Sequence, residues 1–412
     1  MRQLLRCAAL FLASPGLIAA SDGLVLPAGF HAQVVATGLT GIRHLAVRDN
    51  GDVYVSTRVA ANSSDAGIWV LHLDAAHRLV SKQRFGDVTG GTGIRIDKGM
   101  LYASSPTAIY SFKLVDGEPV PGQQHTVVSG LPATAFLNRP IAFDGKGHLF
   151  VSVGGTGNIC AGKPATGQGP VGQSPCPDLT GRSGVWRFRT DVLEQRFPQD
   201  GERLATGVRD LVALDVSPRG SLFGVMHGRN GTHETWPNLV GEADDAAIAE
   251  EMDEITKGSD LGWPYTYYDG VRHVRLTAPE YGGDGHTPAK GRYSAPAIAF
   301  PGHAAPLDLL FYTGHQFPKS YRGGAFVAFH GGSGPTMPAG HPGYNIAFVP
   351  FDRQGHAHGW VTFADGFAGP TPASRNVATA TYRPVGLAAG RDGSLYVADS
   401  NKGQIWRITY AR

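Results

Sequence analysis

DVYVS (residues 52–56) recurs along the chain with substitutions, as MLYAS (100–104), HLFVS (148–152), SLFGV (221–225), AFVAF (325–329) and SLYVA (394–398). In most of these segments apolar and polar side chains alternate, which is the period-2 pattern of a half-buried β-strand. Each segment follows a glycine directly or within two residues. The repeat therefore predicts six strands that occupy equivalent places in the fold.

Each of these strands has predicted neighbours. An apolar strand precedes it, at 42–47, 93–96, 140–143, 211–216, 307–312 and 385–388. A third strand follows it, at 68–73, 109–114, 185–188, 346–351 and 405–410, and more weakly at 252–255. Six such sets predict an all-β fold, a six-bladed β-propeller. Residues 30–35 would close it by adding the outer strand of the last blade. A pair of β-sandwiches would need a central linker, which the sequence does not show.

Composition and the N-terminus limit the remaining possibilities. The 412 residues are 42% hydrophobic and 17% charged, with a formal net charge of +2, so neither nucleic acid nor an anionic membrane is expected as a partner. Residues 1–20 resemble a secretory signal, with Arg2 and Arg6 before an apolar stretch at 4–12 and cleavage expected before Ser21. No later apolar segment is long enough to span a membrane. We expect a periplasmic or secreted protein with one propeller domain, residues 21–412.

Two cysteines remain after the predicted cleavage, Cys160 and Cys176. In an oxidising compartment they favour one disulfide, worth about 3 kcal/mol in the chain-entropy model for a loop of this size. Two unpaired thiols are the alternative. A zinc site has little support, because no CxxC or HxxxH spacing accompanies them.

Arginines recur where the predicted inner strands begin: Arg43, Arg95, Arg139, Arg209 and Arg383. Inner strands of a propeller start at one face of the channel, so these residues would converge around one axis. Several guanidinium groups would repel one another there unless an anion binds between them, and a planar polycarboxylate suits their forked donors. Pairing of each arginine with a nearby acid, such as Asp210 beside Arg209, is the alternative.

Histidines and carboxylates supply further candidates. His44, His227 and His330 lie at ends of inner or middle strands, where a neutral imidazole could take a proton from a substrate hydroxyl. The acidic run Glu250-Glu251-Met252-Asp253-Glu254 could face a hard cation such as Ca²⁺, although a solvated charge run is the more common explanation.

Motifs along nearly all of the mature chain carry a family likeness: GVRDLVAL (207–214), HGRN (227–230), GWPYTYYD (262–269), APEYGGDG (278–285), FYTGHQFP (311–318), AFHG (328–331), FADGFAG (363–369), RPVGLA (383–388) and IWRITY (405–410). With these motifs the chain resembles the sorbosone dehydrogenase-like and pyranose dehydrogenase-like soluble quinoproteins. The resemblance implies a six-bladed propeller that binds pyrroloquinoline quinone (PQQ) and Ca²⁺ over its channel.

The resemblance also assigns residues. Arg209 and Asp210 would bind the cofactor, with Arg383, Arg139 and Arg43 as further cofactor-binding candidates. The backbone carbonyls of Gly228 and Arg229 would hold Ca²⁺. His330, His44 and His227 are the candidate catalytic bases. The implied reaction is oxidation of an aldose, a pyranose or a sugar-derived aldehyde by hydride transfer to PQQ, with electrons passing to a separate acceptor.

Three positions depart from the family pattern. Phe136 stands about where the family has a catalytic histidine, and phenylalanine cannot accept a proton. The family's Trp and Arg after the His-Gly pair are absent from His330-Gly-Gly-Ser-Gly-Pro-Thr336, and Thr266 replaces a cysteine. The first two departures favour an alternative function, a catalytically weakened propeller that binds a small molecule or a protein without turnover.

Overall fold

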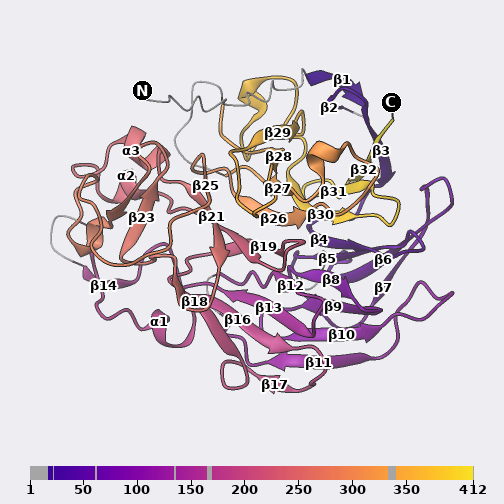
Figure 1. Ribbon diagram of the computed structural model, residues 1–412, viewed down its shortest axis with the longest axis horizontal. Coiled ribbons are helices and arrows are strands. Elements are labelled where there is room, and N and C mark those ends of the chain that lie inside the picture. Colours follow the sequence, from indigo (N-terminus) through magenta and orange to yellow (C-terminus); the bar gives the residue numbers. More distant parts are fainter. Residues whose placement is uncertain are drawn as a thin grey trace, which may run out of the picture.

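Six antiparallel sheets surround a central channel in the computed structural model, which describes residues 17–21, 23–60, 63–133, 136–164, 169–332 and 340–411 (Figure 1). The predicted six-bladed β-propeller is confirmed. Its inner strands are the predicted apolar ones, and neighbouring inner strands contact one another around the ring.

Each blade follows the strand order of the repeat, and two blades gain a fifth, parallel outer strand. The first three blades are β4 (Ile42–Val47), β5 (Val53–Thr57), β6 (Gly67–Leu73) and β7 (Leu79–Phe85); β8 (Ile94–Asp97), β9 (Met100–Ser104), β10 (Ile109–Lys113), β11 (Gln124–Ser129) and β17 (Gln195–Arg196); and β12 (Ile141–Phe143), β13 (His148–Val153), β16 (Gly184–Arg189), β18 (Glu202–Thr206) and β22 (Ser259–Asp260). The last three are β19 (Leu211–Val216), β20 (Leu222–Met226), β21 (Glu250–Ile255) and β25 (Ile298–Phe300); β26 (Pro306–Phe311), β27 (Ala325–Phe329), β28 (Asn345–Val349) and β29 (Val361–Ala364); and β30 (Pro384–Ala389), β31 (Leu395–Asp399), β32 (Ile405–Tyr410) and β3 (Phe30–Ala36).

The ring closes through the N-terminal strand, as predicted. Strand β3 pairs antiparallel with β32, with Phe30 opposite Tyr410, so the two ends of the chain share one blade. Phe30 also contacts the rings of Phe317 and Phe363 edge-on, at centroid distances of 4.8 and 5.0 Å. These contacts bury the closing strand against blade 5, and edge-to-face aromatic pairs add about 0.5–1.5 kcal/mol each beyond their buried area.

Middle strands are buried on both faces because each blade is covered by the next. All five residues of β5, β20 and β27 are buried. The apolar side chains of these strands fill the spaces between blades, and the polar side chains lie in turns and at strand ends. This packing makes the channel a rigid frame for the loops at its two ends.

The insertions form small elements at one side of the ring. They are α1 (Asp178–Gly181), α2 (Thr232–Thr235), α3 (Glu242–Ala246), the 3-10 turn at Pro279–Tyr281, and the hairpins β14 (Ala161–Pro164) with β15 (Pro170–Gly172) and β23 (Thr266–Asp269) with β24 (Val274–Thr277). Two further 3-10 turns, Lys319–Tyr321 and Pro372–Ser374, connect strands of blades 5 and 6. In Figure 1, α2, α3 and β23 lie outside the blade that contains β19 and β21. The predicted disulfide is confirmed, with Cys160 and Cys176 joined at a Cα–Cα distance of 6.1 Å.

The acidic run at 250–254 is not the solvated charge run that the sequence favoured. It forms β21, in which Glu250, Glu251 and Asp253 are buried and Glu254 alone is exposed. Glu251 pairs with Arg275, and Glu250 accepts the backbone N–H groups of Gly228 and Ala305. Residues 1–16 of the predicted signal lie outside the described residues, whereas Leu17–Ser21 form β1, which pairs with β2 (Leu24–Pro27). The described residues include no helix long and apolar enough to cross a membrane.

Candidate functional site

Positive charge gathers at the end of the channel where the inner strands begin, here called the mouth. Arg43, at the start of β4, is close to Arg58, which follows β5, and to Arg383, which precedes β30. Burial, followed by the charges of Arg58 and Arg383, lowers the pKa of Arg43 to about 10. The Arg43 Nε atom is buried and has no hydrogen-bond partner. The mouth therefore contains a guanidinium group whose charge and donor are left unsatisfied by its protein neighbours.

Acidic side chains offset these arginines only in part: the charge of Asp210 acts against the effect of burial on the pKa of Arg43, Arg139 and Arg209, but it forms no direct ion pair with them. Among the described residues, no carboxylate lies within 4.0 Å of the guanidinium of Arg43, Arg58, Arg139, Arg209 or Arg383. Asp210 is adjacent to Arg209 in sequence, but both oxygens of its carboxylate accept hydrogen bonds from the Asn138 side-chain amide at 3.2 Å. The simple pairing that the sequence offered as an alternative is thus wrong for these arginines, although it is right for Arg95.

Arg209 is almost completely buried, at 4% exposure, between two unusual neighbours. Its Nε donates to Asn158 Oδ1 at 3.0 Å. Its guanidinium lies over the ring of Phe136, with 4.9 Å between the Cζ atom and the ring centroid. Phe136, the residue that departs from the family's histidine, therefore lies directly beside the arginine assigned to the cofactor, where it offers an aromatic face and no proton acceptor.

Arg139 has a different environment. Its donors are used by backbone carbonyls: those of Pro106, Phe136, Asn138 and Pro132, at 3.1, 2.8, 2.7 and 2.6 Å. The side chain is 1% exposed. It shapes the loop that presents Phe136, and its donors are already occupied.

His227 and His330 both lie at the mouth. The Nδ1 atom of His227 is 3.2 Å from the Asp210 carbonyl oxygen, which can only accept, so this nitrogen carries the proton and Nε2 keeps a free lone pair. Burial, then the charges of Arg383, Arg43 and His227, holds the pKa of His330 well below its usual range. Its Nε2 lies 2.7 Å from Ser400 Oγ. The lowered pKa keeps His330 neutral at neutral pH.

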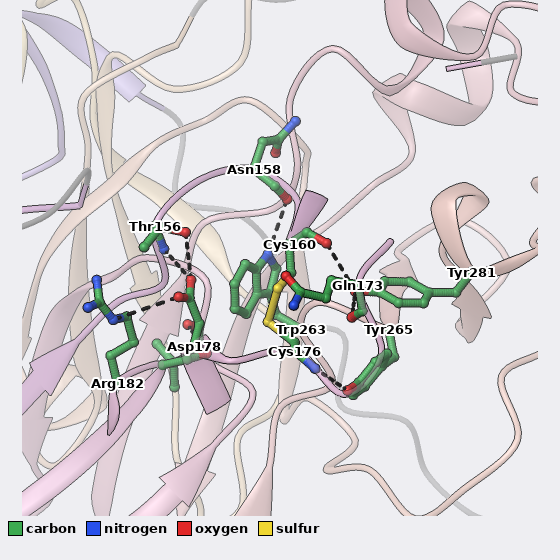
Figure 2. Close-up of a disulfide and its surroundings, with 12 residues drawn as sticks. Thr156, Asn158, Cys160, Gln173, Cys176, Asp178, Arg182, Trp263, Tyr265 and Tyr281 are labelled. Carbon is green, nitrogen blue, oxygen red and sulfur yellow. Dashed lines mark hydrogen bonds and ion pairs between the residues drawn. A yellow bond between two sulfur atoms is a disulfide. The ribbon is translucent and has the colours of Figure 1, made fainter. Parts of the chain in front are cut away.

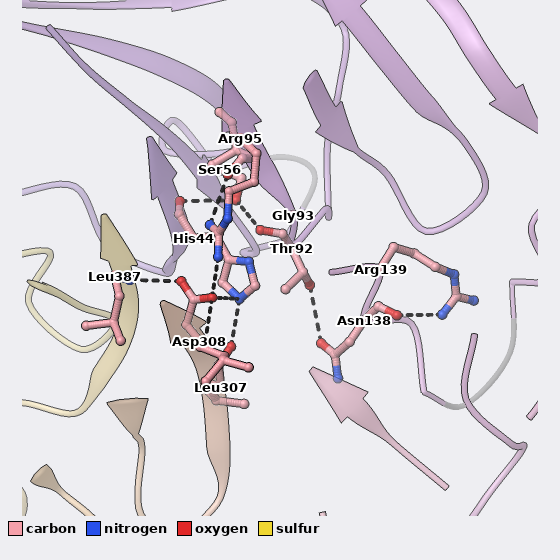
Figure 3. A network of polar contacts seen from close by, with 12 residues as sticks. His44, Ser56, Thr92, Gly93, Arg95, Asn138, Arg139, Leu307, Asp308 and Leu387 are labelled. Atoms are coloured by element: carbon pink, nitrogen blue, oxygen red, sulfur yellow. Dashed lines mark hydrogen bonds and ion pairs between the residues drawn. The ribbon is translucent and has the colours of Figure 1, made fainter. Parts of the chain in front are cut away.

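His44 lies deeper, inside the channel (Figure 3). Its Nε2 contacts the Leu307 carbonyl at 2.7 Å and lies 3.7 Å from Asp308 Oδ1. Asp308 also accepts from Arg95 at 2.5 Å and from the backbone N–H of Leu387 at 2.8 Å. The ring is 1% exposed, and burial lowers its pKa to about 4. The structure thus brings His227, His330, Arg43 and Arg383 together and separates His44 and Arg95 from them.

The segment assigned to Ca²⁺ is held from both sides. The Gly228 N–H donates to Glu250 Oε2 at 2.7 Å, and the Asn230 N–H donates to Asn158 Oδ1 at 3.1 Å. The side chain of Arg229 is turned away into a buried ion pair with Glu280, at 2.9 Å. Within the described ranges no three His, Cys, Asp or Glu side chains are grouped to hold a metal, so a Ca²⁺ here would depend on backbone carbonyls.

Three polar residues of the mouth were not predicted: Arg58, Asn138 and Asn158. The Arg58 guanidinium donates to Asn138 Oδ1 at 2.7 Å, and Asn138 in turn donates to Asp210. A signal for Arg58 was present, because it follows a middle strand, and middle strands end at the face where inner strands begin. The asparagines had no such signal, since their loops follow no repeat.

Known structures share this architecture. A Trichoderma reesei protein of carbohydrate-active enzyme family AA12, in an iodide structure, superposes with a TM-score of 0.75 at 19% identity, covering 97% of this chain and 100% of that one. The holo PQQ domain of Coprinopsis cinerea pyranose dehydrogenase gives 0.71 at 20% identity, covering 96% and 99%. The PQQ-bound aldose sugar dehydrogenase of Streptomyces coelicolor gives 0.56 at 18% identity, covering 93% and 99%. At these identities the likeness establishes the fold.

Sequence comparison goes further. An uncharacterized protein of Borreliella burgdorferi is 26% identical over 214 residues, which are 51% of this chain and about half of that protein, 49%. The TrAA12-like family model matches residues 24–257 and 277–411, which include every blade strand except β22 and the residues of the mouth. The chain therefore belongs to the TrAA12-like family.

Proposed function

We propose that this protein is an exported PQQ-dependent oxidoreductase that oxidises an aldose, a pyranose or a sugar-derived aldehyde. The observation that carries the proposal is the only partly compensated arginine group at the mouth of a TrAA12-like propeller. A planar tricarboxylate such as PQQ would offset the charges of Arg43, Arg58 and Arg383 together, with Arg383 held in place by its bonds to the His330 and Gly331 carbonyls. Known structures of the same fold from other organisms include PQQ-bound sugar dehydrogenases, which supports the choice of cofactor.

The residues present fit the cofactor on the arginine side. Arg43, Arg58 and Arg383 would hold its carboxylates, and Arg209 would approach from the wall of the mouth beside Asp210. The carbonyls of Gly228 and Arg229 would hold Ca²⁺, with Glu250 fixing the strand end below them. When bound, PQQ supplies a two-electron acceptor for hydride, polarised by the metal as a Lewis acid.

His227 is our first candidate for the base that takes the proton from the sugar hydroxyl. Its Nδ1–H is held by the Asp210 carbonyl, which orients the ring and leaves Nε2 as acceptor. His330 is the second candidate, because the surrounding positive charge keeps it neutral. His44 is third, since its ring lies buried in the channel.

Phe136 favours a second function, a propeller that binds the cofactor or another anion without turnover. The ring lies on the guanidinium of Arg209 in the place where the family has a histidine. This alternative keeps the anion site and removes only the proton transfer.

Export is supported by the disulfide, since such bonds persist in oxidising compartments. The sequence has three cysteines and no Cys-x-x-Cys-His motif for covalent haem, so we propose that electrons leave to a separate acceptor.

Titration of the purified protein with PQQ in the presence of Ca²⁺, followed by dye reduction with a panel of aldoses and sugar aldehydes, tests both functions. Saturable binding with sugar-dependent dye reduction supports the dehydrogenase. PQQ binding without turnover supports the alternative, and absence of PQQ binding overturns the dehydrogenase and leaves a propeller that recognises another ligand. His227→Asn keeps a donor for the Asp210 carbonyl and removes the acceptor nitrogen, so it should abolish turnover with PQQ affinity retained.

A further inference from the structure

Asn158 lies at the junction of three segments that meet behind the mouth. Its Oδ1 accepts from Arg209 Nε at 3.0 Å and from the Asn230 N–H at 3.1 Å, and its Nδ2 donates to the Asn230 carbonyl. One amide side chain thus joins the arginine that precedes β19 to the His-Gly-Arg-Asn segment that follows β20. These two segments are the ones to which the proposed function assigns PQQ and Ca²⁺.

The segment around Asn158 also binds Arg209 by a hydrogen bond between the two backbones. The Gly155 N–H donates to the Arg209 carbonyl at 2.9 Å. A side chain at residue 155 would lie 2.5 Å from the Trp263 ring, so glycine is required for the indole to pack flat on this turn. The turn at 154–158 therefore lies between Arg209 on one side and Trp263 on the other.

Trp263 connects this turn to the disulfide (Figure 2). Its Nε1 donates to the Asn158 carbonyl at 3.1 Å, and its ring packs with Cys160 and Cys176 in one buried cluster. The disulfide closes two residues beyond Asn158, and the far side of its loop is fixed by Tyr265, whose hydroxyl accepts the Cys176 N–H at 3.0 Å. Asn158 thus has its backbone held by the disulfide cluster and its side chain held at the mouth.

We propose that Asn158 is a positioning residue that couples the buried cluster of Cys160, Cys176 and Trp263 to Arg209 and Asn230. The proposal rests on the proposed function for its consequence, cofactor affinity, and on the contacts above for its mechanism. Arg209 has no carboxylate within 4.0 Å among the described residues, so the Asn158 bond and the Phe136 ring are what orient its guanidinium. When the disulfide is absent, the turn at 154–158 loses one of its anchors, beside Trp263 and the Thr156–Asp178 bonds, and Arg209 is held less firmly.

Two asparagine variants test the side chain. Asn158→Ala removes every side-chain contact, whereas Asn158→Asp keeps the oxygen that accepts from Arg209 and the Asn230 N–H and loses only the donor to the Asn230 carbonyl. For Asn158→Ala we expect faster hydrogen exchange of the peptide at 227–231, greater modification of Arg209 by phenylglyoxal, and at least a tenfold loss of PQQ affinity, with an unchanged denaturation midpoint. Asn158→Asp should restore exchange protection and Arg209 shielding. Asn50→Ala, in the turn after β4, is the matched control.

The tether is tested by Cys160→Ser with Cys176→Ser and, where that pair fails to fold, by Trp263→Phe, which removes the indole donor and part of the ring that packs on the disulfide. Both should change exchange at 227–231 and Arg209 labelling in the same direction as Asn158→Ala. Unchanged exchange and labelling in the tether variants overturn the coupling to the disulfide. Unchanged values in Asn158→Ala overturn the positioning role. Exchange and labelling need no cofactor, so a wild-type protein that binds no PQQ refutes the proposed function while these readings still decide the inference.

Discussion

Arg43 and Arg95 occupy equivalent positions on neighbouring inner strands, but Arg95 in the channel interior has a carboxylate partner and Arg43 at the mouth has none among the described residues. Each is the second residue of its strand, in β4 and β8. Arg95 reaches Asp308 at 2.5 Å, whereas Arg43 meets other arginines and keeps an unpartnered Nε. Arg95 is therefore compensated by a direct ion pair in the interior, whereas Arg43 at the mouth has none in the described part of the chain, which is why we propose the mouth as an anion site.

A β-bulge separates the two outcomes. Strand β8 pairs residue for residue with β9, with Arg95 opposite Tyr102. In β4 the register shifts between Ile42 and Leu45, so two residues, Arg43 and His44, share the space of one. The extra residue places His44 against Asp308 in the channel and leaves Arg43 at the mouth. Bulges commonly re-aim a side chain beside a functional site.

The largest expected effect is in the interior, where Asp308→Asn should lower the free energy of unfolding by about 3–5 kcal/mol. The substitution leaves Arg95 without its counter-charge in a site where Asp308 is fully buried. Urea denaturation measures the loss. Arg95→Met in the same chain should recover part of it, because the unpaired charge is then removed as well. A loss below about 1 kcal/mol would mean that the interior pair is not what stabilises the channel.

Asp215 tests the interior through pH. Burial raises its pKa from 3.8 to about 6. Between these values the unfolded chain releases the proton and the native protein keeps it, so the native state binds more protons and its stability falls as pH rises. The total contribution is about 3 kcal/mol, at about 1.4 kcal/mol per pKa unit.

We therefore expect wild-type protein to lose about 3 kcal/mol relative to Asp215→Asn between pH 4 and 7, measured by denaturation at each pH. His44, with a pKa lowered to about 4, contributes the opposite slope in both proteins and cancels in the difference. A difference that stays constant with pH contradicts the raised pKa of Asp215.

At the mouth, removal of an arginine should change the free energy of unfolding in the opposite direction. Arg43→Met removes a buried, repelled charge, so the free energy of unfolding should stay the same or rise by up to about 1 kcal/mol. PQQ affinity, measured by titration with Ca²⁺ present, should fall about tenfold or more, the cost of about 1.4 kcal/mol or above for a lost charged hydrogen bond. Arg95→Met is the matched control, expected to destabilise the fold because it leaves Asp308 buried and unpaired. A destabilised Arg43→Met protein would remove the distinction between the two regions.

The fold was predictable because one pattern repeats six times and each copy agrees with the others. Glycine, alternation and a third strand recur even where individual copies are weak, as at 252–255. The disulfide was predictable because only two of the three cysteines lie outside the predicted signal. Acidic residues at 250–254 misled the prediction, since charge in a sequence indicates exposure, whereas Arg275 and the backbone donors that bury this strand come from distant segments.

The site was predictable only in part, again because the contacts that decide it come from other segments of the chain. Strand-start arginines could be recognised one by one, but a one-residue bulge decides which of them faces the mouth, and GIRH (41–44) and GIRI (93–96) differ too little to reveal it. Arg139 shows the second limit: its four carbonyl partners belong to loops without a repeat.

The smallest effect concerns Phe136, which is the mouth's substitute for a counter-charge at Arg209. Phe136→Leu should lower the free energy of unfolding by about 0.5–1 kcal/mol through loss of the cation–π contact, apart from a small change in packing. Phe136→Tyr keeps the ring face and should be neutral, so the pair of variants, compared by urea denaturation, separates the π contribution from volume. If the Phe136→Leu protein is as stable as the Phe136→Tyr protein, the ring does not offset the charge of Arg209. Its orientation would then depend on Asn158 alone, and Arg209 would resemble Arg43 more closely than its burial suggests.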